Sequence, residues 1–120
     1  MNCLKDTRTM APLDETRGNT TTAVLEIVTF RLAPGANRET FLTSAAATES
    51  WLRKRGAVRQ RMLTEGEDGT WTDAVEWTSM EAAKSAGAEV MEAADFAPFM
   101  QAIDPKSVTM RHETIRWRMV

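Results

Sequence analysis

The sequence predicts an α+β protein whose elements follow the order strand, helix, strand, strand, helix, strand. The first observation is a change of period within residues 69–83, where the two-residue alternation of a strand gives way to helical spacing at Ser79. The second is that strand-like stretches begin and end the periodic part of the chain. Right-handed crossovers then give a four-stranded antiparallel sheet with two helices on one face.

The first predicted strand, residues 23–32, carries apolar side chains on both faces, which is typical of a central strand covered on both sides. Ala-Pro-Gly at 33–35 ends it, and Asn37 is placed to cap a helix that ends at Arg55 and Gly56. This helix has one apolar stripe, formed by Phe41, Ala45, Thr48 and Leu52. We therefore expect one buried and one solvated helix face.

A hairpin is predicted next, from residues 57–64 and the alternating residues that start at Trp71, with a loop at 65–69 that contains an Asp-Gly pair. The expected register places Arg59, Arg61 and Glu76 on one face of the hairpin. The other face receives Val58, Gln60, Met62, Trp71, Asp73, Val75 and Trp77. This register predicts a cross-strand contact between an arginine and Glu76.

The second predicted helix begins at the cap residue Ser79 and continues to Ala94, and Gly87 allows it to approach the sheet closely. Asp95 is expected to cap a further short helical turn. The last predicted strand spans residues 107–119 and carries His112 near its middle.

Length and composition indicate one domain with neither a nucleic-acid partner nor a membrane partner. The chain has 120 residues, and its net charge of −2 comes from acidic and basic residues that are interspersed. Residues 1–22 have hardly any periodicity and predict a flexible N-terminal arm, so the domain comprises residues 23–120. Cys3 has no partner for an internal disulfide, and no apolar run is long enough for a signal peptide or a membrane span, so we expect a cytoplasmic protein.

The predicted sheet has one face that no helix covers. Leu25 and Ile27 lie on the opposite side of the first strand from Val24 and Val28, so large apolar side chains occupy both faces. Burying each such side chain is worth roughly 1.5 to 3 kcal/mol. We therefore expect the uncovered face to meet a second copy of the chain in a homodimer.

Two short segments carry a resemblance to a known family: Leu-Ala-Pro-Gly at 32–35 after the first strand, and Trp-Thr-Ser-Met-Glu-Ala at 77–82 where strand changes to helix. With the element order, they make residues 23–120 similar to the dimeric α+β barrel superfamily, and most similar to its antibiotic-biosynthesis-monooxygenase (ABM)-like branch. The resemblance implies a ferredoxin-like βαββαβ domain that pairs with a second copy so that the two sheets close into a barrel, with a pocket between each sheet and its helices or in the barrel interior.

The same resemblance leaves several activities open, because such folds serve cofactor-free quinone-forming monooxygenases, haem-degrading enzymes, lactone isomerases and stress-responsive proteins with no known reaction. In the haem-degrading relatives the histidine lies on a helix, whereas His112 is predicted on a strand, which disfavours that activity.

Glu26, Asp73 and His112 are the candidate catalytic residues. Glu26 and Asp73 each interrupt an apolar strand face, and a carboxylate in an aromatic pocket has a raised pKa and can accept a proton from a carbon acid. The alternative for each carboxylate is a structural ion pair with an arginine. His112 is the one histidine, and its alternative role is a hydrogen-bonded side chain at a subunit contact.

Arg61, Glu76, Trp71 and Trp77 are the candidate substrate-binding residues. Arg61 would position an oxyanion, whereas its alternative is an interfacial ion-pair network with Glu76. The two tryptophans would line a flat aromatic pocket, and Trp77 is also a candidate for the core. No linear motif for zinc, a nucleotide or a serine hydrolase is found, so we expect no metal and no cofactor, although a flavin site needs no such motif.

Two functions follow from these residues. The first is a homodimer that binds a small aromatic or polyketide-like compound and acts on it by cofactor-independent oxygenation or proton transfer, with Glu26, Asp73 or His112 as the base. The second is a non-catalytic stress-associated or ligand-binding homodimer in which these polar residues serve the interface. An enclosed cavity lined by Glu26, Asp73 or His112 would favour the first, whereas the same groups tied up in ion pairs across the dimer would favour the second.

Overall fold

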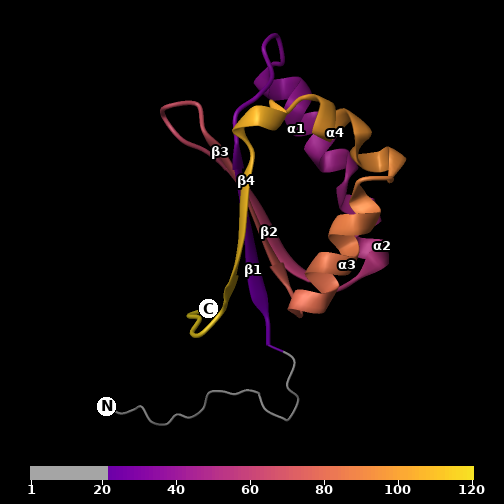
Figure 1. Ribbon diagram of the computed structural model, residues 1–120, viewed down its shortest axis with the longest axis vertical. Helices are drawn as coiled ribbons and strands as arrows, with labels where there is room; N and C mark the ends of the chain where they lie inside the picture. Colours follow the sequence, from indigo (N-terminus) through magenta and orange to yellow (C-terminus); the bar gives the residue numbers. More distant parts are fainter. Residues whose placement is uncertain (1–21) are drawn as a thin grey trace.

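Four strands form one antiparallel sheet in the computed structural model, which describes residues 22–120 (Figure 1). The strands are β1 (Val24–Phe30), β2 (Val58–Glu65), β3 (Trp71–Trp77) and β4 (Thr109–Thr114), and their order across the sheet is β2-β3-β1-β4. This is the predicted α+β arrangement with the first strand in a central position. The predicted N-terminal arm, residues 1–22, lies outside the described residues apart from Thr22.

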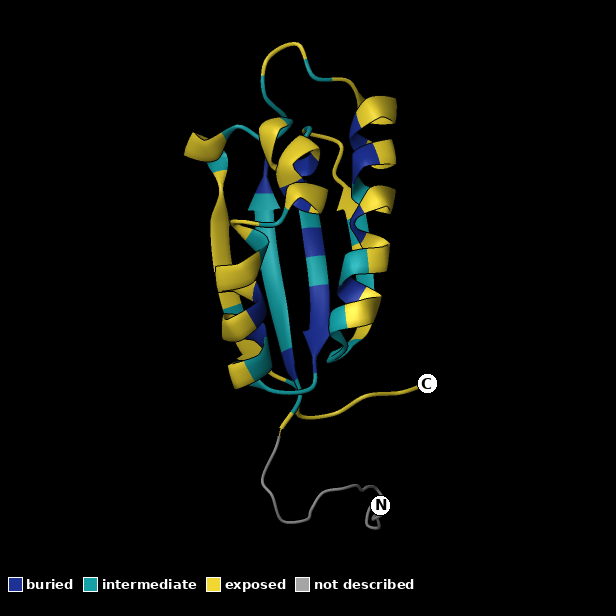
Figure 2. Ribbon diagram, turned by 90° about the vertical axis from the view of Figure 1, so that its right-hand side faces the viewer, coloured by how far each residue is buried: buried dark blue, intermediate teal, exposed yellow. Residues whose placement is uncertain are grey.

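The helices lie on one face of this sheet (Figures 1 and 2). They are α1 (Arg38–Ala47), α2 (Glu49–Arg55), α3 (Met80–Val90) and α4 (Ala97–Gln101), with short 3-10 segments η3 (Ala94–Phe96) and η4 (Pro105–Ser107). The caps predicted at Asn37 and Ser79 form: Asn37 Oδ1 accepts a hydrogen bond from the N–H of Thr40 at 2.8 Å, and Ser79 Oγ accepts one from the N–H of Ala82 at 3.0 Å.

The predicted first helix is divided into α1 and α2 at Thr48. The Thr48 hydroxyl donates a hydrogen bond to the carbonyl oxygen of Ala45 at 2.6 Å, and such a return to the preceding turn bends helices. The N–H of Leu52 donates to the Thr48 carbonyl at 3.2 Å, so the chain continues as a helix past the bend. Phe41, Thr48 and Leu52 are buried, which confirms the predicted apolar stripe.

The second predicted helix is shorter than expected, because α3 ends at Val90 and a turn separates it from η3. Asp95 does not cap that turn; Ala93 occupies the cap position and makes no side-chain hydrogen bond there. The cap farther along the chain is Asp104, whose Oδ1 accepts a hydrogen bond from the N–H of Lys106 at 3.0 Å.

The predicted hairpin register is wrong over most of β2. Glu65 pairs directly with Trp71, so the loop spans residues 66–70. The pairing is therefore shifted by one residue from the expected register. A bulge between Val58 and Gln60 then restores the expected pairing only at Val58 and Trp77. Because side chains alternate between the faces of a sheet, this one-residue shift places the side chains of residues 60–65 on the face opposite to the expected one. Arg61 therefore lies on the face that the helices cover, and Gln60 and Met62 lie on the opposite face.

The last strand ends at Thr114, five residues before the position expected from the alternation. β4 pairs only with β1, and the N–H of Ile115 makes the final bond of this ladder, to the carbonyl oxygen of Ala23 at 3.1 Å. β1 begins at the next residue, so the chain beyond Ile115 has no strand to pair with. A strand pattern in the sequence needs a partner strand to become a ladder.

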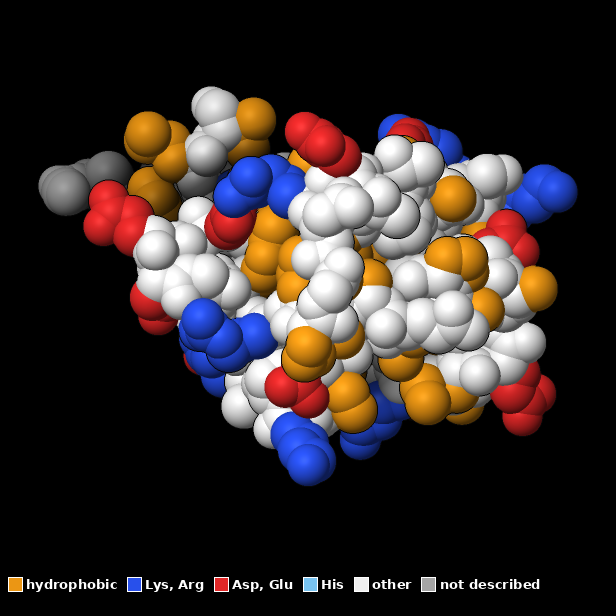
Figure 3. All heavy atoms as spheres, turned by 90° about the horizontal axis from the view of Figure 1, so that it is seen from above, with side chains coloured by type: hydrophobic (Ala, Val, Ile, Leu, Met, Phe, Trp, Pro, Cys, Tyr) orange, Lys and Arg blue, Asp and Glu red, His pale blue; other side chains and the backbone are white. Residues whose placement is uncertain are grey.

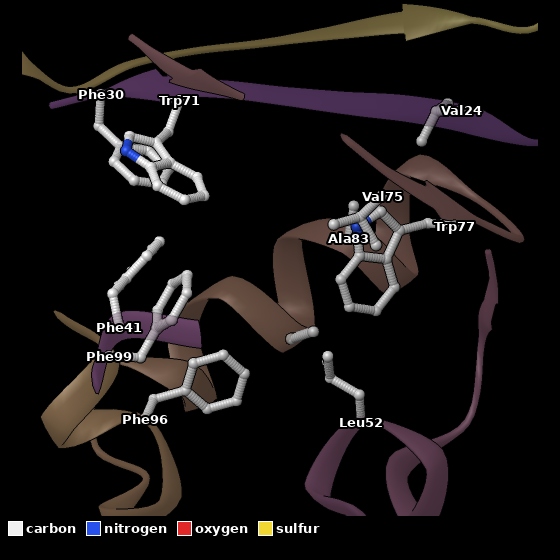
Figure 4. Packing of buried hydrophobic residues seen from close by; sticks show 11 residues of the cluster. Val24, Phe30, Phe41, Leu52, Trp71, Val75, Trp77, Ala83, Phe96 and Phe99 are labelled. Atoms are coloured by element: carbon white, nitrogen blue, oxygen red, sulfur yellow. The ribbon is translucent and has the colours of Figure 1, made fainter. Parts of the chain in front are cut away.

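The main core lies between the sheet and the helices (Figure 2). Figure 4 shows Phe30 and Trp71 pointing from the strands toward a cluster of phenylalanines on the helices. Phe41 and Phe99 stack with ring centroids 5.0 Å apart, and Phe41 meets Trp71 edge to face at 5.1 Å. Such contacts add about 0.5 to 1.5 kcal/mol beyond the burial itself.

The other sheet face carries no helix, as expected. Leu25 and Ile27 are only half-buried on it, and Met62 is exposed.

Over the end of the molecule seen in Figure 3, acidic and basic side chains alternate around the rim without a block of either sign. Among residues 22–120, no helix combines the length and apolar character needed to cross a membrane.

Candidate functional site

A cavity of about 270 Å³ lies between the covered sheet face and the helices. Aromatic and aliphatic side chains make most of its wall, and three charged residues interrupt them. Its lining comprises Glu26, Val28, Phe30, Leu52, Arg61, Asp73, Val75, Trp77, Gly87, Val90, Met91, Phe96, Phe99, Met100, Ile103, Pro105, Val108 and Met110. A mostly apolar, concave site with a few polar groups is the usual form of a small-molecule pocket.

One polar corner of the cavity is formed by Glu26 with His112 behind it. Glu26 on β1 pairs in register with His112 on β4, and Glu26 Oε1 lies 3.4 Å from His112 Nε2. Both side chains are mostly buried. His112 does not itself line the cavity, so it reaches the interior only through Glu26.

The environment of Glu26 favours its neutral form. Burial raises the pKa of this carboxyl above the ordinary value of 4.5, and the nearby His112 and the indole N–H of Trp77 oppose the rise. A carboxyl whose pKa moves toward neutrality is a better proton acceptor once it is ionised. Glu26 therefore has the electrostatic character that a general base needs.

Trp77 lines the cavity and is 4% exposed. Its Nε1 is buried and completes no hydrogen bond within the described part of the chain, although Glu26 is nearby. A buried donor without an acceptor costs roughly 1 to 3 kcal/mol, and the Glu26 carboxylate is the acceptor placed to meet this one.

Arg61 and Asp73 form a second polar wall, and their charges are already matched. Arg61 Nε donates to Asp73 Oδ1 at 2.9 Å and Nη2 donates to Oδ2 at 2.8 Å, while Nη1 donates to the Thr48 hydroxyl at 2.7 Å. The guanidinium carbon also lies 5.3 Å from the centre of the Phe99 ring. This set fixes β2, β3, the α1–α2 bend and α4 against one another.

Trp71 and Glu76 lie outside the cavity. Trp71 is buried in the aromatic core beside Phe41. Glu76 is on the uncovered sheet face, where Arg118 Nη1 donates to its Oε1 at 2.7 Å and Arg118 Nη2 forms a second contact with Oε2. The predicted arginine contact with Glu76 is made by Arg59 at 3.8 Å and not by Arg61, because of the shifted register.

Several lining residues were not singled out in the sequence. Phe96 and Phe99 come from the short segment that follows α3, where the spacing indicated only a helical turn. Met91, Met100 and Met110 come from three different elements. The abundance of phenylalanine and methionine was visible in the composition, but only the fold brings these side chains to one place.

A larger hollow of about 520 Å³ lies between α1, α2 and the edge strand β2. It is more open than the cavity, and of the predicted site residues only Arg61 borders it. Within residues 22–120, no group of acidic, histidine and cysteine side chains is placed to hold a metal ion. The smaller cavity is therefore the better candidate site.

Comparison with solved structures finds the same fold in other proteins. A candidate antibiotic biosynthesis monooxygenase from Bordetella bronchiseptica superposes with a TM-score of 0.65 at 14% identity, covering 80% of this chain and 99% of that one. A similar candidate from Chloroflexus aurantiacus gives 0.62 at 11% identity, covering 82% and 98%. SnoaB, a cofactor-independent oxygenase from Streptomyces nogalater, gives 0.56 at 17% identity, covering 82% and 96%.

Comparisons by sequence add nothing to these matches: no protein-family model and no curated protein matches the chain.

Proposed function

We propose that the chain forms a homodimer and binds a small, flat, partly apolar molecule in the cavity of each protomer. Its fold, which is that of the antibiotic biosynthesis monooxygenase-like proteins of the dimeric α+β barrel superfamily, supports this proposal. One observation carries this proposal: Glu26 faces an apolar cavity with His112 3.4 Å behind it and the unpartnered Trp77 N–H beside it. A fold alone does not assign chemistry, so the reaction is argued from these side chains.

Glu26 is the base of the proposed reaction. It accepts a proton from the hydroxyl or activated C–H of an aromatic compound, and the resulting anion is oxidised directly by dioxygen. With 1-naphthol as substrate, one oxygen atom enters the product and the other leaves as water, giving 1,4-naphthoquinone. Carbon loses four electrons and dioxygen gains four, so no cofactor is needed.

The neighbouring groups assist this proton transfer. His112 and the Trp77 N–H both stabilise the ionised form of Glu26. Asp73 is less available as a base, because both of its carboxylate oxygens accept hydrogen bonds from Arg61. Arg61 donates its hydrogen bonds to Asp73 and Thr48, so this charge-matched pair shapes the cavity wall and does not act on the substrate directly.

The homodimer forms through the uncovered sheet face. Leu25 and Ile27 on β1 and the exposed Met62 on β2 supply the apolar surface. A second copy related by a two-fold axis presents the same residues in return, which gives a self-complementary contact. Removing this surface from water supplies the free energy of association.

A second candidate function is a dimer that binds a ligand without transforming it. Asp73 and Glu76, two of the predicted site residues, both form ion pairs with arginines of the same protomer. Under this function the cavity binds the same class of compound, and Glu26 fixes its orientation by accepting a hydrogen bond.

Dioxygen uptake in the presence of 1-naphthol separates the two functions. A base that acts in proton transfer contributes about a hundredfold or more, so we expect uptake and naphthoquinone formation by the wild type and a loss of about a hundredfold in Glu26→Gln. Glu67→Gln, a change at an exposed glutamate in the loop between β2 and β3, is the matched control. Binding of 1-naphthol without dioxygen uptake would support the second function, and absence of binding would contradict both.

A further inference from the structure

Methionine is concentrated at the edge of the cavity. Met91 at the end of α3, Met100 on α4 and Met110 on β4 all line it, and so does Val108, which precedes β4. These four side chains nevertheless remain largely in contact with solvent: Met91 is 70% exposed, Met110 56%, Val108 42% and Met100 40%. Large apolar side chains that line a cavity and also contact solvent mark its opening, and we call these four residues the methionine opening.

The methionine opening lies next to the polar corner. Met110 pairs in register with Val28, and His112 pairs with Glu26, so Met110 and His112 are two residues apart on the same face of β4. Moving along β4 therefore leads from the polar corner to apolar side chains at the edge of the sheet. Val28 and Met110 both line the cavity, which makes the apolar surface continuous from inside to outside.

The size of the cavity limits how much of a ligand it can enclose. Pockets for small molecules usually measure about 300 to 1,000 Å³, and a dry cavity of about 150 Å³ holds benzene. At about 270 Å³, the cavity accommodates a polar ring system but leaves little room for a long substituent. A larger ligand has to extend through the opening, where methionine side chains adapt to different shapes because they are unbranched and flexible.

We propose that the ligand is an amphipathic phenol or enol, whose polar ring is held at Glu26 and Trp77 and whose apolar tail lies across Met91, Met100, Val108 and Met110. This inference rests on the proposed function, since it takes the polar corner as the site of the head group. It adds an apolar tail to the polar head group of the ligand. The methionine opening binds the tail and selects among compounds with the same head.

The test is an equilibrium titration with 4-alkylphenols of increasing chain length, from phenol to 4-hexylphenol. Each methylene that leaves water tightens binding by up to about fourfold, so we expect a gain of about two- to fourfold per methylene in the wild-type protein. In a Met91→Gln/Met110→Gln double variant we expect this gain to fall to less than about 1.5-fold per methylene, and the gain is measured relative to phenol binding by the same variant.

Met119→Gln is the matched control. Met119 is 83% exposed, and it does not line the cavity. We expect the control to keep the full dependence on chain length. Equal dependence in the wild type and the double variant, with phenol bound by both, would overturn the methionine opening and leave the proposed function standing. Failure of every alkylphenol to bind would overturn both.

Discussion

Arg61 and Asp73 are joined by two parallel hydrogen bonds, Nε to Oδ1 at 2.9 Å and Nη2 to Oδ2 at 2.8 Å, in the wall of the cavity. The pair runs diagonally across the ladder between β2 and β3, since Arg61 is opposite Val75 and Asp73 is opposite Leu63. Both side chains are largely buried, at 17% and 10% exposure. The pair thereby fixes the edge strand β2 to the centre of the sheet on the face that the helices cover.

Removing one member of this pair is expected to cost more than removing both. Asp73→Asn leaves the Arg61 charge in a largely buried site, which is expected to lower the free energy of unfolding by about 3 kcal/mol. The double variant Arg61→Met/Asp73→Leu leaves no unmatched charge and is expected to lose less. Urea unfolding of the wild type, Asp73→Asn and Arg61→Met/Asp73→Leu measures the difference. Equal losses in the single and double variants would contradict the structural role of the pair.

Arg118 is expected to stabilise the uncovered face through Glu76. The Glu76 side chain is 4% exposed, and its other basic neighbour, Arg59, is more distant at 3.8 Å. Arg118→Ala should therefore lower the free energy of unfolding by about 1 to 2 kcal/mol, because a hydrogen-bonded charge is left short of its partner. Arg116→Ala, a change at an exposed arginine two residues away, is the control. A thermal melt in which both variants match the wild type would contradict this assignment.

The pKa of Glu26 predicts how stability depends on pH. Below about pH 4.5 the carboxyl is protonated in both the folded and the unfolded state. Between that pH and the raised pKa of the folded state, only the folded state retains the proton, so the free energy of unfolding falls as the pH increases. Glu26→Gln cannot show this loss.

The stability of Glu26→Gln relative to the wild type should therefore rise across this pH interval and remain constant above it. Urea unfolding from pH 4 to pH 8 measures the trend. A relative stability that falls with increasing pH would mean that the partners of Glu26 outweigh its burial, and that its pKa is lowered.

The proposed dimer depends on Ile27 at the centre of the uncovered sheet face. Ile27→Glu places a charge where a second copy would cover it, and an unpaired charge in an interface costs several kcal/mol. We expect the variant to sediment as a single chain at concentrations where the wild type sediments as two. Lys84→Glu, on the exposed side of α3, is expected to leave the dimer intact. A wild-type protein that is monomeric at all accessible concentrations would contradict the proposal.

Much of the fold was predictable because its signals are local. Asn37 and Ser79 cap helices where the sequence placed them, and β3 follows the alternation from Trp71. The hairpin register was not predictable in the same way. It depends on the length of the loop and on the bulge near Arg59, and neither leaves a clear pattern in the sequence.

The candidate site was predictable only in part. Glu26 stood out as a carboxylate in an apolar strand, and it does line the cavity. Asp73 stood out for the same reason, but the shifted register brings Arg61 to its face and turns it into an ion pair. The phenylalanines and methionines of the wall carry no signal of their own, since apolar residues at helical spacing also describe an ordinary core.

The most direct test of the central claim is calorimetric titration of 1-naphthol into the wild type, Trp77→Phe and Glu26→Gln, with Trp117→Phe as a control at an exposed tryptophan. If the cavity holds the ligand between the Trp77 indole ring and the Glu26 carboxylate, each of the first two changes should weaken binding by about three- to tenfold. The control should bind as the wild type does. Unchanged affinity in both Trp77→Phe and Glu26→Gln would contradict the claim that this cavity is the binding site.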